Sequence, residues 1–374
     1  MKGRAAVVAV CAAAVAARAW LAFVAPPSVD LESYGIVADI VRSGAPLYES
    51  THRYNYSPVW SWMLRGLDGV ARSTGLSLSE AVRSALLLSD LATAMLLFRI
   101  AGRRRGVAPW TAAALFLANP VGIWVSSVQG QFDGLSLFFL LAAIAVSSPI
   151  PDGAKRNHAL FPALLLAVSM MIKQVTALHP ILWIRRKSAA LAMLGAYLLV
   201  ALLFLPYAAQ WRAIARHVLL YRAVPRSYGL SELVLWDARW ALPVSILALA
   251  AAAIVAWRLR FADYARGSLV VFLVLLFFAP GLGAQYLIWP LTVGALFAGA
   301  GYFAFTAAGT LWILGSHFGL PGSGRYMGHL VWLSVGFWLL REARALSRAT
   351  LREPAEAQPA PPGASPLTQG SLAK

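Results

Sequence analysis

The sequence predicts an all-α protein, a transmembrane helical bundle, and three observations lead to this prediction. Of the 374 residues, 60% are hydrophobic and only 13% are charged, whereas soluble domains carry about 25% charged residues. Apolar runs recur along the chain, several of them near the roughly 20 residues that cross a bilayer. The basic residues stand in short clusters between these runs, as the positive-inside rule describes for cytoplasmic loops. We therefore expect a polytopic protein with about 10–13 membrane segments, some of them short or re-entrant.

The net charge of +17 comes from 32 Lys and Arg against 15 Asp and Glu. In a soluble protein such an excess would indicate nucleic-acid binding. Because the clusters flank apolar runs, we assign the charge to membrane orientation and to anionic membrane lipids instead, and we expect no nucleic-acid partner. The chain has one cysteine, Cys11, which excludes an intramolecular disulfide and a thiolate metal cluster.

Polar stretches separate the predicted membrane segments. The first segment ends at Pro26, and the polar stretch 28–57 contains a short helix that we expect along the membrane interface, ended by residues 44–46. The apolar segments lie at 5–25, 58–70, 82–101, 107–127, 132–146, 160–184, 189–206, 241–257, 269–279, 285–300, 303–319 and 328–340.

The basic clusters also predict a fold-back inside the segment 160–184. A single crossing would place the clusters on either side of this segment on opposite faces of the membrane. A re-entrant pair of short helices, bent at Lys173 and Gln174, removes the conflict, because irregular backbone at membrane depth is tolerated where it lines a polar cavity. The clusters expected in the cytoplasm, with both termini, are 2–4, 103–105, 155–156, 185–187, 258–260 and 341–348.

In this arrangement the polar stretches 28–57, 128–131 and 207–240 share the outer face. The first holds Asp30 and Glu32 directly after the first crossing. A carboxylate at this position could be a general base for a hydroxyl group, or the two acids together could hold a divalent cation such as Mg²⁺ or Mn²⁺. Equally, Asp30 could only cap the interfacial helix.

Amide side chains and one acid interrupt the apolar surroundings of the second stretch. Gln129, Gln131 and Asp133 could bind sugar hydroxyls at the ends of two helices. In the alternative reading, Asn119-Pro120 breaks one helix and Asp133 caps the next. Asp90, within an apolar run, is expected to make a hydrogen bond between helices.

Cationic side chains stand at two unusual places. Lys173 lies about a dozen residues from either end of its apolar run, where a lysine usually indicates a functional site, although it could snorkel to a headgroup. The third outer stretch violates the positive-inside pattern, and its guanidinium groups suit a phosphate or anionic lipid headgroups. Its cations are Arg212, Arg216, His217, Arg222, Arg226 and Arg239.

Three stretches together carry a resemblance to a known family. They run from Asp30 to residue 58, from Asn119 to Asp133, and from 285 to 289. On these residues the chain resembles the GT-C superfamily of polytopic, lipid-phosphate-sugar-dependent glycosyltransferases. It is similar to bacterial polyprenyl-phosphate-mannose-dependent mannosyltransferases and, more distantly, to the catalytic subunit of GPI mannosyltransferase I. No glycine-rich phosphate loop is present, so the sequence does not indicate a nucleotide-sugar donor.

The resemblance implies transfer of a sugar, mannose foremost, from a polyprenyl-phosphate donor, with inversion, on the outer face of a bacterial inner membrane. The acceptor would be a glycolipid, a lipid-linked glycan or a protein. Asp30 would be the general base, with Glu32 as a second acid beside it and a possible Mg²⁺ or Mn²⁺. The donor phosphate would bind Lys173, His217, Arg222 and Arg226. The substrate-binding candidates are His52, Tyr54, Tyr56, Gln129, Gln131, Asp133, Gln174, Gln285, Tyr286 and Trp289.

Under this interpretation the chain has three parts. Residues 1–206 form an N-terminal transmembrane module whose outer loop 26–57 is catalytic. Residues 207–352 comprise the donor-phosphate loop and the C-terminal transmembrane helices, and the Pro- and Ala-rich residues 353–374 form a disordered tail. A transporter or flippase for a lipid-linked or small polar substrate remains the alternative, because it would also use intramembrane charges and broken helices.

Overall fold

The computed structural model describes residues 2–147, 159–220, 240–281 and 283–356. These residues contain helices and no strand, which confirms the all-α prediction. Three helices are long and apolar enough to cross a membrane, or up to five spans if each of two bent helix pairs counts as one. Other apolar runs form helices of 10–17 residues.

The helices follow the order of the predicted segments, with most bounds shifted by a few residues. They are α1 (Lys2–Val24), α2 (Val29–Ser43), α3 (Leu47–Ser50), α4 (Pro58–Thr74), α5 (Leu78–Gly102), α6 (Pro109–Leu117), α7 (Pro120–Ile123), α8 (Asp133–Ser147), α9 (Leu160–Ile172), α10 (Lys187–Leu202), α11 (Trp211–Ile214), α13 (Ala241–Arg258), α14 (Tyr264–Phe278), α15 (Ile288–Gly294), α16 (Ala300–His317) and α17 (Gly328–Glu356).

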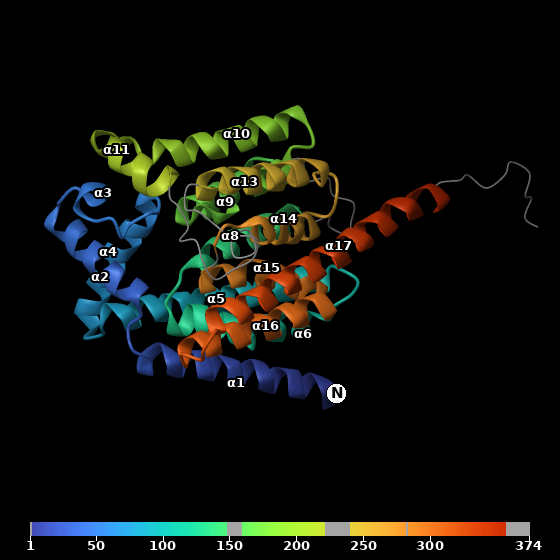
Figure 1. Ribbon diagram of the computed structural model, residues 1–374, viewed down its shortest axis with the longest axis horizontal. Helices are drawn as coiled ribbons and strands as arrows, with labels where there is room; N and C mark the ends of the chain where they lie inside the picture. Colours follow the sequence, from blue (N-terminus) through green and yellow to red (C-terminus); the bar gives the residue numbers. More distant parts are fainter. Residues whose placement is uncertain (1, 148–158, 221–239, 282, 357–374) are drawn as a thin grey trace, which may run out of the picture.

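Most of the long helices run along the long axis of the molecule (Figure 1). Helices α2, α3, α4 and α11 lie together at one end, on the left of the view, which we call the α2 end. The N-terminus and the far end of α17 lie at the opposite end. The helices therefore form a bundle with a separate group of short helices at one end.

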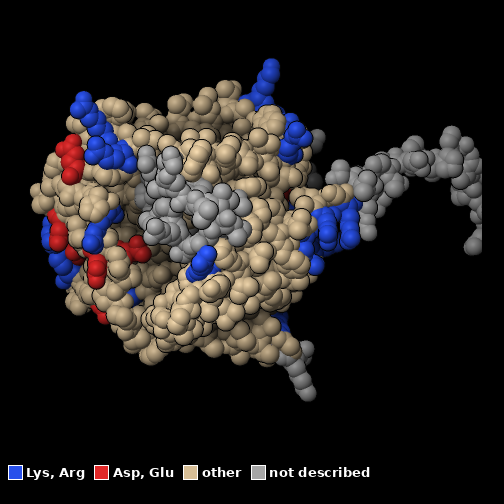
Figure 2. Space-filling model, viewed as in Figure 1, with Lys and Arg blue, Asp and Glu red and all other residues tan. Residues whose placement is uncertain are grey.

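Basic clusters that are far apart in the sequence meet at the end opposite α2, which we call the basic end. Arg104 forms a two-pronged salt bridge with Asp263, with contacts of 2.7 and 2.5 Å. Arg185 donates to the carbonyl oxygen of Ala262 at 2.6 Å. Figure 2 shows the acidic side chains of this face mainly toward the α2 end and basic side chains where α17 leaves the body.

The chain breaks at Lys173 and turns back, as predicted. Helix α9 ends at Ile172, and Lys173 has extended backbone angles, φ −152° and ψ 132°. The residues that follow form two 3₁₀ turns, Gln174–Thr176 and His179–Trp183, rather than a second α-helix. The start of α9 lines one cavity together with Trp183, Arg185 and Arg186, so the segment returns to the end from which it came.

A second break follows Leu117, at Asn119. Its side-chain oxygen accepts from the backbone N–H groups of Val121 and Gly122, at 3.0 and 3.4 Å, and so caps α7. The halves before and after this break are bent by 51°, and the second half continues as a π-helical turn, Trp124–Val128. The helix-breaking alternative for Asn119-Pro120 is therefore correct.

Arg18, a charged residue within the first apolar segment, makes hydrogen bonds on both sides of this break. It is fully buried and forms a 2.7 Å salt bridge with Asp90. It also donates to the carbonyl oxygen of Leu117 at 2.9 Å and to Ser126 at 2.7 Å. Asp90 in turn accepts from Ser126 at 2.6 Å, so the predicted interhelical role of Asp90 is confirmed, with Arg18 as an unforeseen partner.

Candidate functional site

A cavity of about 490 Å³ lies at the α2 end and collects side chains from four separate stretches of the chain. The stretches are the start of α2, the loop 52–56, the break after α9, and the turn before α15. The cavity is lined by Val29, Asp30, Ser33, His52, Arg53, Asn55, Tyr56, Lys173, Gln174, Val175, Gln285, Tyr286 and Trp289.

Asp30 reaches the cavity because another residue caps helix α2. The Ser28 hydroxyl oxygen accepts from the backbone N–H of Leu31 at 3.2 Å, and the same hydroxyl donates to the carbonyl oxygen of Gln129 at 2.6 Å. Ser28 is thus the N-cap, and Asp30 stands in the first turn of the helix. The capping role considered for Asp30 is therefore wrong, and its carboxylate is left to the cavity.

The surroundings of Asp30 raise the pKa of its carboxyl group. Burial raises the pKa of the carboxyl above its ordinary value, whereas the Gln131 side chain and the charge of Lys173 lower it, and Asp133 raises it further; the net shift is upward. The Gln131 amide atoms have no partner of standard hydrogen-bond geometry within the described part of the chain. A raised pKa brings a carboxylate closer to the basicity that proton abstraction near neutral pH requires.

Glu32 does not share this position. It is exposed and does not line the cavity. Residues two apart on a helix do not face each other, so α2 points Asp30 and Glu32 in different directions. The pair does not fit a chelating site for Mg²⁺ or Mn²⁺. Within the described residues, no three His, Cys, Asp or Glu side chains cluster with a geometry that could hold a metal ion.

Lys173 and Asp133 are brought together as an ion pair at the wall of the cavity. The Lys173 ammonium lies 2.5 Å from Asp133 Oδ2, and Trp289 Nε1 donates to Asp133 Oδ1 at 2.7 Å. The ammonium also lies 4.9 Å from the centre of the Phe132 ring and 5.2 Å from that of Tyr56. Two residues expected to contact substrate are thus engaged with each other, and their charges cancel.

An aromatic cluster of Tyr34, Trp60 and Phe132 packs beneath the cavity-lining turn of α2, on the buried side of the helix. The rings of Trp60 and Phe132 stack with centroids 3.9 Å apart and an interplanar angle of 12°. Tyr34, on α2, meets both rings edge-on at 5.3 and 5.9 Å. All three side chains are at most 3% exposed. Such aromatic pairs contribute about 0.5–1.5 kcal/mol each beyond the burial of their surface, so this cluster anchors the helix that carries Asp30.

Arg83 is a second buried cation that was not among the predicted site residues. It is 2% exposed, and its guanidinium donates to the carbonyl oxygens of Ala25, Pro26 and Val128 at 2.6, 2.7 and 2.6 Å. The first two belong to the link between α1 and α2, and the third precedes the turn that carries Gln131. Arg83 therefore ties together the two segments that flank Asp30. In the sequence, Arg83 could have been recognised as a charged residue within the apolar stretch 78–102.

Gly130 brings the same two segments into direct contact. Its φ is +71°, a conformation that favours glycine. A Cβ atom at this position would lie 2.7 Å from Cδ2 of Leu31 on α2. The turn 128–131 and the first turn of α2 can therefore approach this closely only with glycine at position 130.

A second cavity, of about 700 Å³, adjoins the first and shares His52 with it. Its cationic side chains come from α11 and the π-helical turn Ala215–Leu219 that follows. The cavity is lined by His52, Trp211, Arg212, Ala215, Arg216, His217 and Leu220. Helical turns thus replace much of the irregular loop expected after residue 207. Arg222 and Arg226 lie outside the described residues.

The other predicted substrate-binding residues divide into two groups. Gln174 lines the first cavity and donates to the carbonyl oxygen of Asn55 at 3.1 Å. Tyr54 is buried; its hydroxyl bonds to the carbonyl oxygen of Ser57 and accepts from the N–H of Ser61 at 2.9 Å. Residues that line the cavity are His52, Tyr56, Gln174, Gln285, Tyr286 and Trp289, whereas Tyr54, Gln129, Gln131 and Asp133 do not.

Comparison with known proteins does not identify a family. No protein-family model matches the chain, and no curated protein or solved structure matches it.

Proposed function

We propose that this chain is an integral membrane glycosyltransferase that moves a sugar, mannose foremost, from a polyprenyl-phosphate donor to a hydroxyl group of a glycolipid, lipid-linked glycan or protein acceptor. The observation that supports the proposal is a half-buried carboxylate, Asp30, in a polar cavity that adjoins a cation-lined cavity. The described residues also include three helices long and apolar enough to cross a membrane. A base beside an anion site is the arrangement that transfer from a lipid phosphate requires.

In the proposed reaction, Asp30 accepts the proton of the acceptor hydroxyl as its oxygen attacks the anomeric carbon of the donor sugar. The bond between the anomeric carbon and the phosphate oxygen breaks, and the polyprenyl phosphate leaves with both bonding electrons. A single displacement inverts the anomeric configuration. The reaction needs no metal ion held by Asp30 and Glu32, which agrees with their divergent directions on α2.

The departing phosphate gains negative charge, so cations near it stabilise the transition state most strongly where little water is present. Arg212, Arg216 and His217 line the adjoining cavity and are our candidates among the described residues. Arg222 and Arg226, predicted from the sequence, could complete this set. Lys173, already paired with Asp133, would act on Asp30 instead: its charge lowers the pKa of that carboxyl and keeps more of it ionised.

The proposed orientation follows from the basic end. The positive-inside rule assigns the end with Arg104 and Arg185 to the cytoplasm, which leaves the α2 end and both cavities on the outer face. A bacterial inner membrane is the proposed location, since the likeness to bacterial lipid-phosphate-sugar enzymes carries that expectation.

The test uses the purified full chain in lipid nanodiscs, with polyprenyl phosphates bearing radiolabelled mannose, glucose, galactose or arabinose. One of these four donors should transfer its radiolabelled sugar to an acceptor that is recovered in the lipid extract. Asp30→Asn should reduce the rate by about 10²-fold or more while donor binding persists. Glu32→Gln is the matched control and should retain the rate within about twofold, since surface substitutions away from a site have small effects. Equal losses in both variants would contradict the role of Asp30.

A transporter is the second candidate, favoured by the broken helices at Asn119 and Lys173, because transporters build their sites from discontinuous helices. Reconstituted vesicles with a fluorescent polyprenyl-phosphate sugar distinguish the two. Flux across the bilayer without transfer to any acceptor, abolished by Asp30→Asn, would establish transport and exclude the enzyme.

A further inference from the structure

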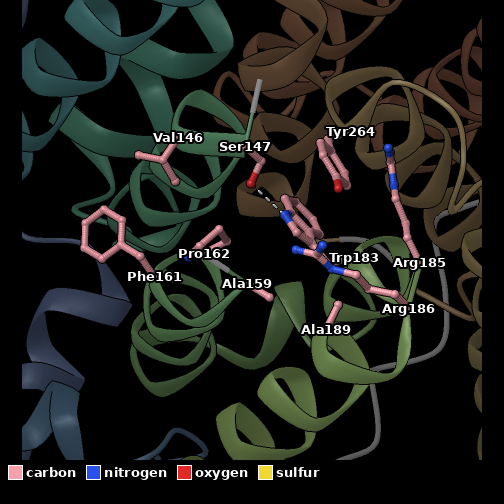
Figure 3. A pocket seen from close by; sticks show the side chains of 10 residues that line it. All are labelled: Val146, Ser147, Ala159, Phe161, Pro162, Trp183, Arg185, Arg186, Ala189 and Tyr264. Carbon is pink, nitrogen blue, oxygen red and sulfur yellow. Dashed lines mark hydrogen bonds between the residues drawn. The ribbon is translucent and has the colours of Figure 1, made fainter. Parts of the chain in front are cut away.

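We propose that a cavity at the basic end binds the phosphate headgroup of an anionic phospholipid. This cavity measures about 620 Å³ and shares no wall residue with the two cavities at the α2 end. Figure 3 shows its side chains, which come from the end of α8, the start of α9, the end of the fold-back, α10 and α14. It is lined by Val146, Ser147, Ala159, Phe161, Pro162, Trp183, Arg185, Arg186, Ala189 and Tyr264.

Arg185 and Arg186 supply the positive charge of the cavity. Arg185 is held in place: its guanidinium lies 3.9 Å from the centre of the Tyr264 ring and donates one hydrogen bond, to the carbonyl oxygen of Ala262. No carboxylate pairs with it among the residues that the structure describes. Figure 3 shows Arg186 extending toward Trp183. A fixed guanidinium keeps further N–H groups for a phosphate, which it binds in a planar, two-pronged geometry.

A neighbouring cavity extends the positive surface. It measures about 500 Å³, shares Ser147, Arg185 and Tyr264 with the first, and adds Arg104 and Arg105. The acid in its wall, Asp263, is already engaged by both terminal nitrogens of Arg104. The described walls of the two cavities therefore carry an excess of positive charge toward any group that enters.

The other side of the cavity is apolar, and this favours a lipid over free phosphate. Phe161 is 53% exposed and Leu160, beside it on α9, is 75% exposed. Trp183 stacks on Tyr264, with centroids 4.5 Å apart and an interplanar angle of 10°, and donates from Nε1 to Ser147 at 2.8 Å. This stacked pair forms an aromatic wall beside the two arginines. An anionic headgroup at the two arginines would thus have its acyl chains beside Phe161 and Leu160.

Basic pockets between membrane helices are known sites for anionic headgroups, and this one is formed by the fold-back at Lys173. Its wall includes the residues where the re-entrant segment starts and ends. Binding here would hold the two ends of that segment together. The inference concerns binding alone and does not depend on the proposed transferase activity.

The experiment measures lipid binding to the full chain in detergent by native mass spectrometry. Dioleoyl phosphatidylglycerol is titrated, with dioleoyl phosphatidylcholine as the neutral lipid and inorganic phosphate as competitor. Arg185→Gln with Arg186→Gln should weaken phosphatidylglycerol binding about tenfold, which corresponds to ~1.4 kcal/mol. Arg341→Gln with Arg344→Gln removes the same charge from exposed positions on α17 and should change binding less than about twofold.

A third variant tests the contribution of the cavity volume independently of the positive charge. Ala189→Leu keeps every arginine and fills part of the cavity, so it should also weaken phosphatidylglycerol binding, while leaving the melting temperature within a few degrees of the original. The proposal is overturned if both arginine pairs weaken binding equally, if phosphatidylcholine binds as tightly as phosphatidylglycerol, or if inorganic phosphate displaces the lipid at equal concentration. The last result would identify free phosphate as the ligand.

Discussion

Lys173 and Asp133 form a buried ion pair in which the side chains are 6% and 0% exposed. Forty positions apart in the chain, they join the break after α9 to the first residue of α8. The position of the break in the cavity wall therefore depends on a contact between two charges. Such a pair contributes little net stability compared with apolar residues, but loss of one partner leaves a buried charge uncompensated.

Lys173→Met should consequently destabilise the protein by about 3–5 kcal/mol, and Asp133→Asn should do the same because it leaves the ammonium unpaired. The double variant should recover most of this loss, since the introduced methionine side chain carries no charge and the amide oxygen at position 133 can still accept from Trp289. Thermal unfolding of the three variants in nanodiscs gives the measurement. Additive losses in the double variant would show that the two charges do not interact.

The pH dependence of transfer should report the pKa of Asp30. A base is active when it is ionised, so kcat/KM should fall as the pH decreases through this pKa. Because burial raises the pKa, the fall should occur at a higher pH than the roughly 3.9 of an ordinary aspartate. Gln131→Leu removes a group that lowers the pKa and should move the fall to still higher pH. A shift in the opposite direction would contradict this assignment.

Asp30→Asn should not destabilise the protein at pH 7. A carboxyl whose pKa is raised in the folded state costs stability once the pH exceeds its unfolded value, because the ionised form prefers the unfolded chain. Removal of that charge should leave the melting temperature unchanged or increase it. A loss of rate together with a retained or higher melting temperature is typical of an active-site residue.

Arg83→Lys should show whether Arg83 positions α2 for the reaction or only stabilises the fold. Lysine keeps the charge but cannot donate to the carbonyl oxygens of Ala25, Pro26 and Val128 together. The first turn of α2 should then move relative to the turn at Gln131, and kcat should fall by up to about 10²-fold, as for other small misplacements, with the KM for the donor little changed. Arg99→Lys, at an exposed position of the same helix, is the control and should retain the original kcat. A purely structural role would lower the melting temperature instead of kcat.

Gly130→Ala and Gly44→Ala compare two glycines of nearly equal backbone angle. Their φ values are +71° and +73°, so alanine should cost each about 1–2 kcal/mol of backbone strain. Only at position 130 would the new Cβ meet another side chain, that of Leu31, whereas position 44 has no atom within 4 Å. Gly130→Ala should therefore be the more destabilising variant in thermal unfolding, and Leu31→Ala should relieve the difference.

Residues close to each helix end or break were sufficient to predict much of the fold. Gly44 ends α2, Asn119-Pro120 breaks a helix, and a lysine in apolar surroundings marks the fold-back, all as predicted. Each of these signals acts within a few residues of its own position. Boundaries of the remaining helices moved by only a few residues, except for α17, which extends well beyond residue 340.

The partners of the buried cations Arg18 and Arg83 cannot be predicted from the sequence. Their hydrogen-bond partners are mainly backbone carbonyls, 99 positions away for Leu117 and 58 for Ala25, and every residue of a chain carries the same carbonyl group. No pattern in the sequence distinguishes an acceptor that will face a guanidinium from one that will not. A charged residue within an apolar run is visible, but its partner is not.

By itself the sequence determined the helical class, the apolar segments and the breaks at Asn119 and Lys173, because hydropathy, charge and turn-forming residues act over a turn or two of chain. Only the tertiary structure decided that Ser28 caps α2 and frees Asp30, that Glu32 faces away, and that Lys173 is paired with Asp133. These relations depend on which distant helices pack together. Helix packing is determined by many weak contacts between residues far apart in the sequence, so it cannot be read from any one residue.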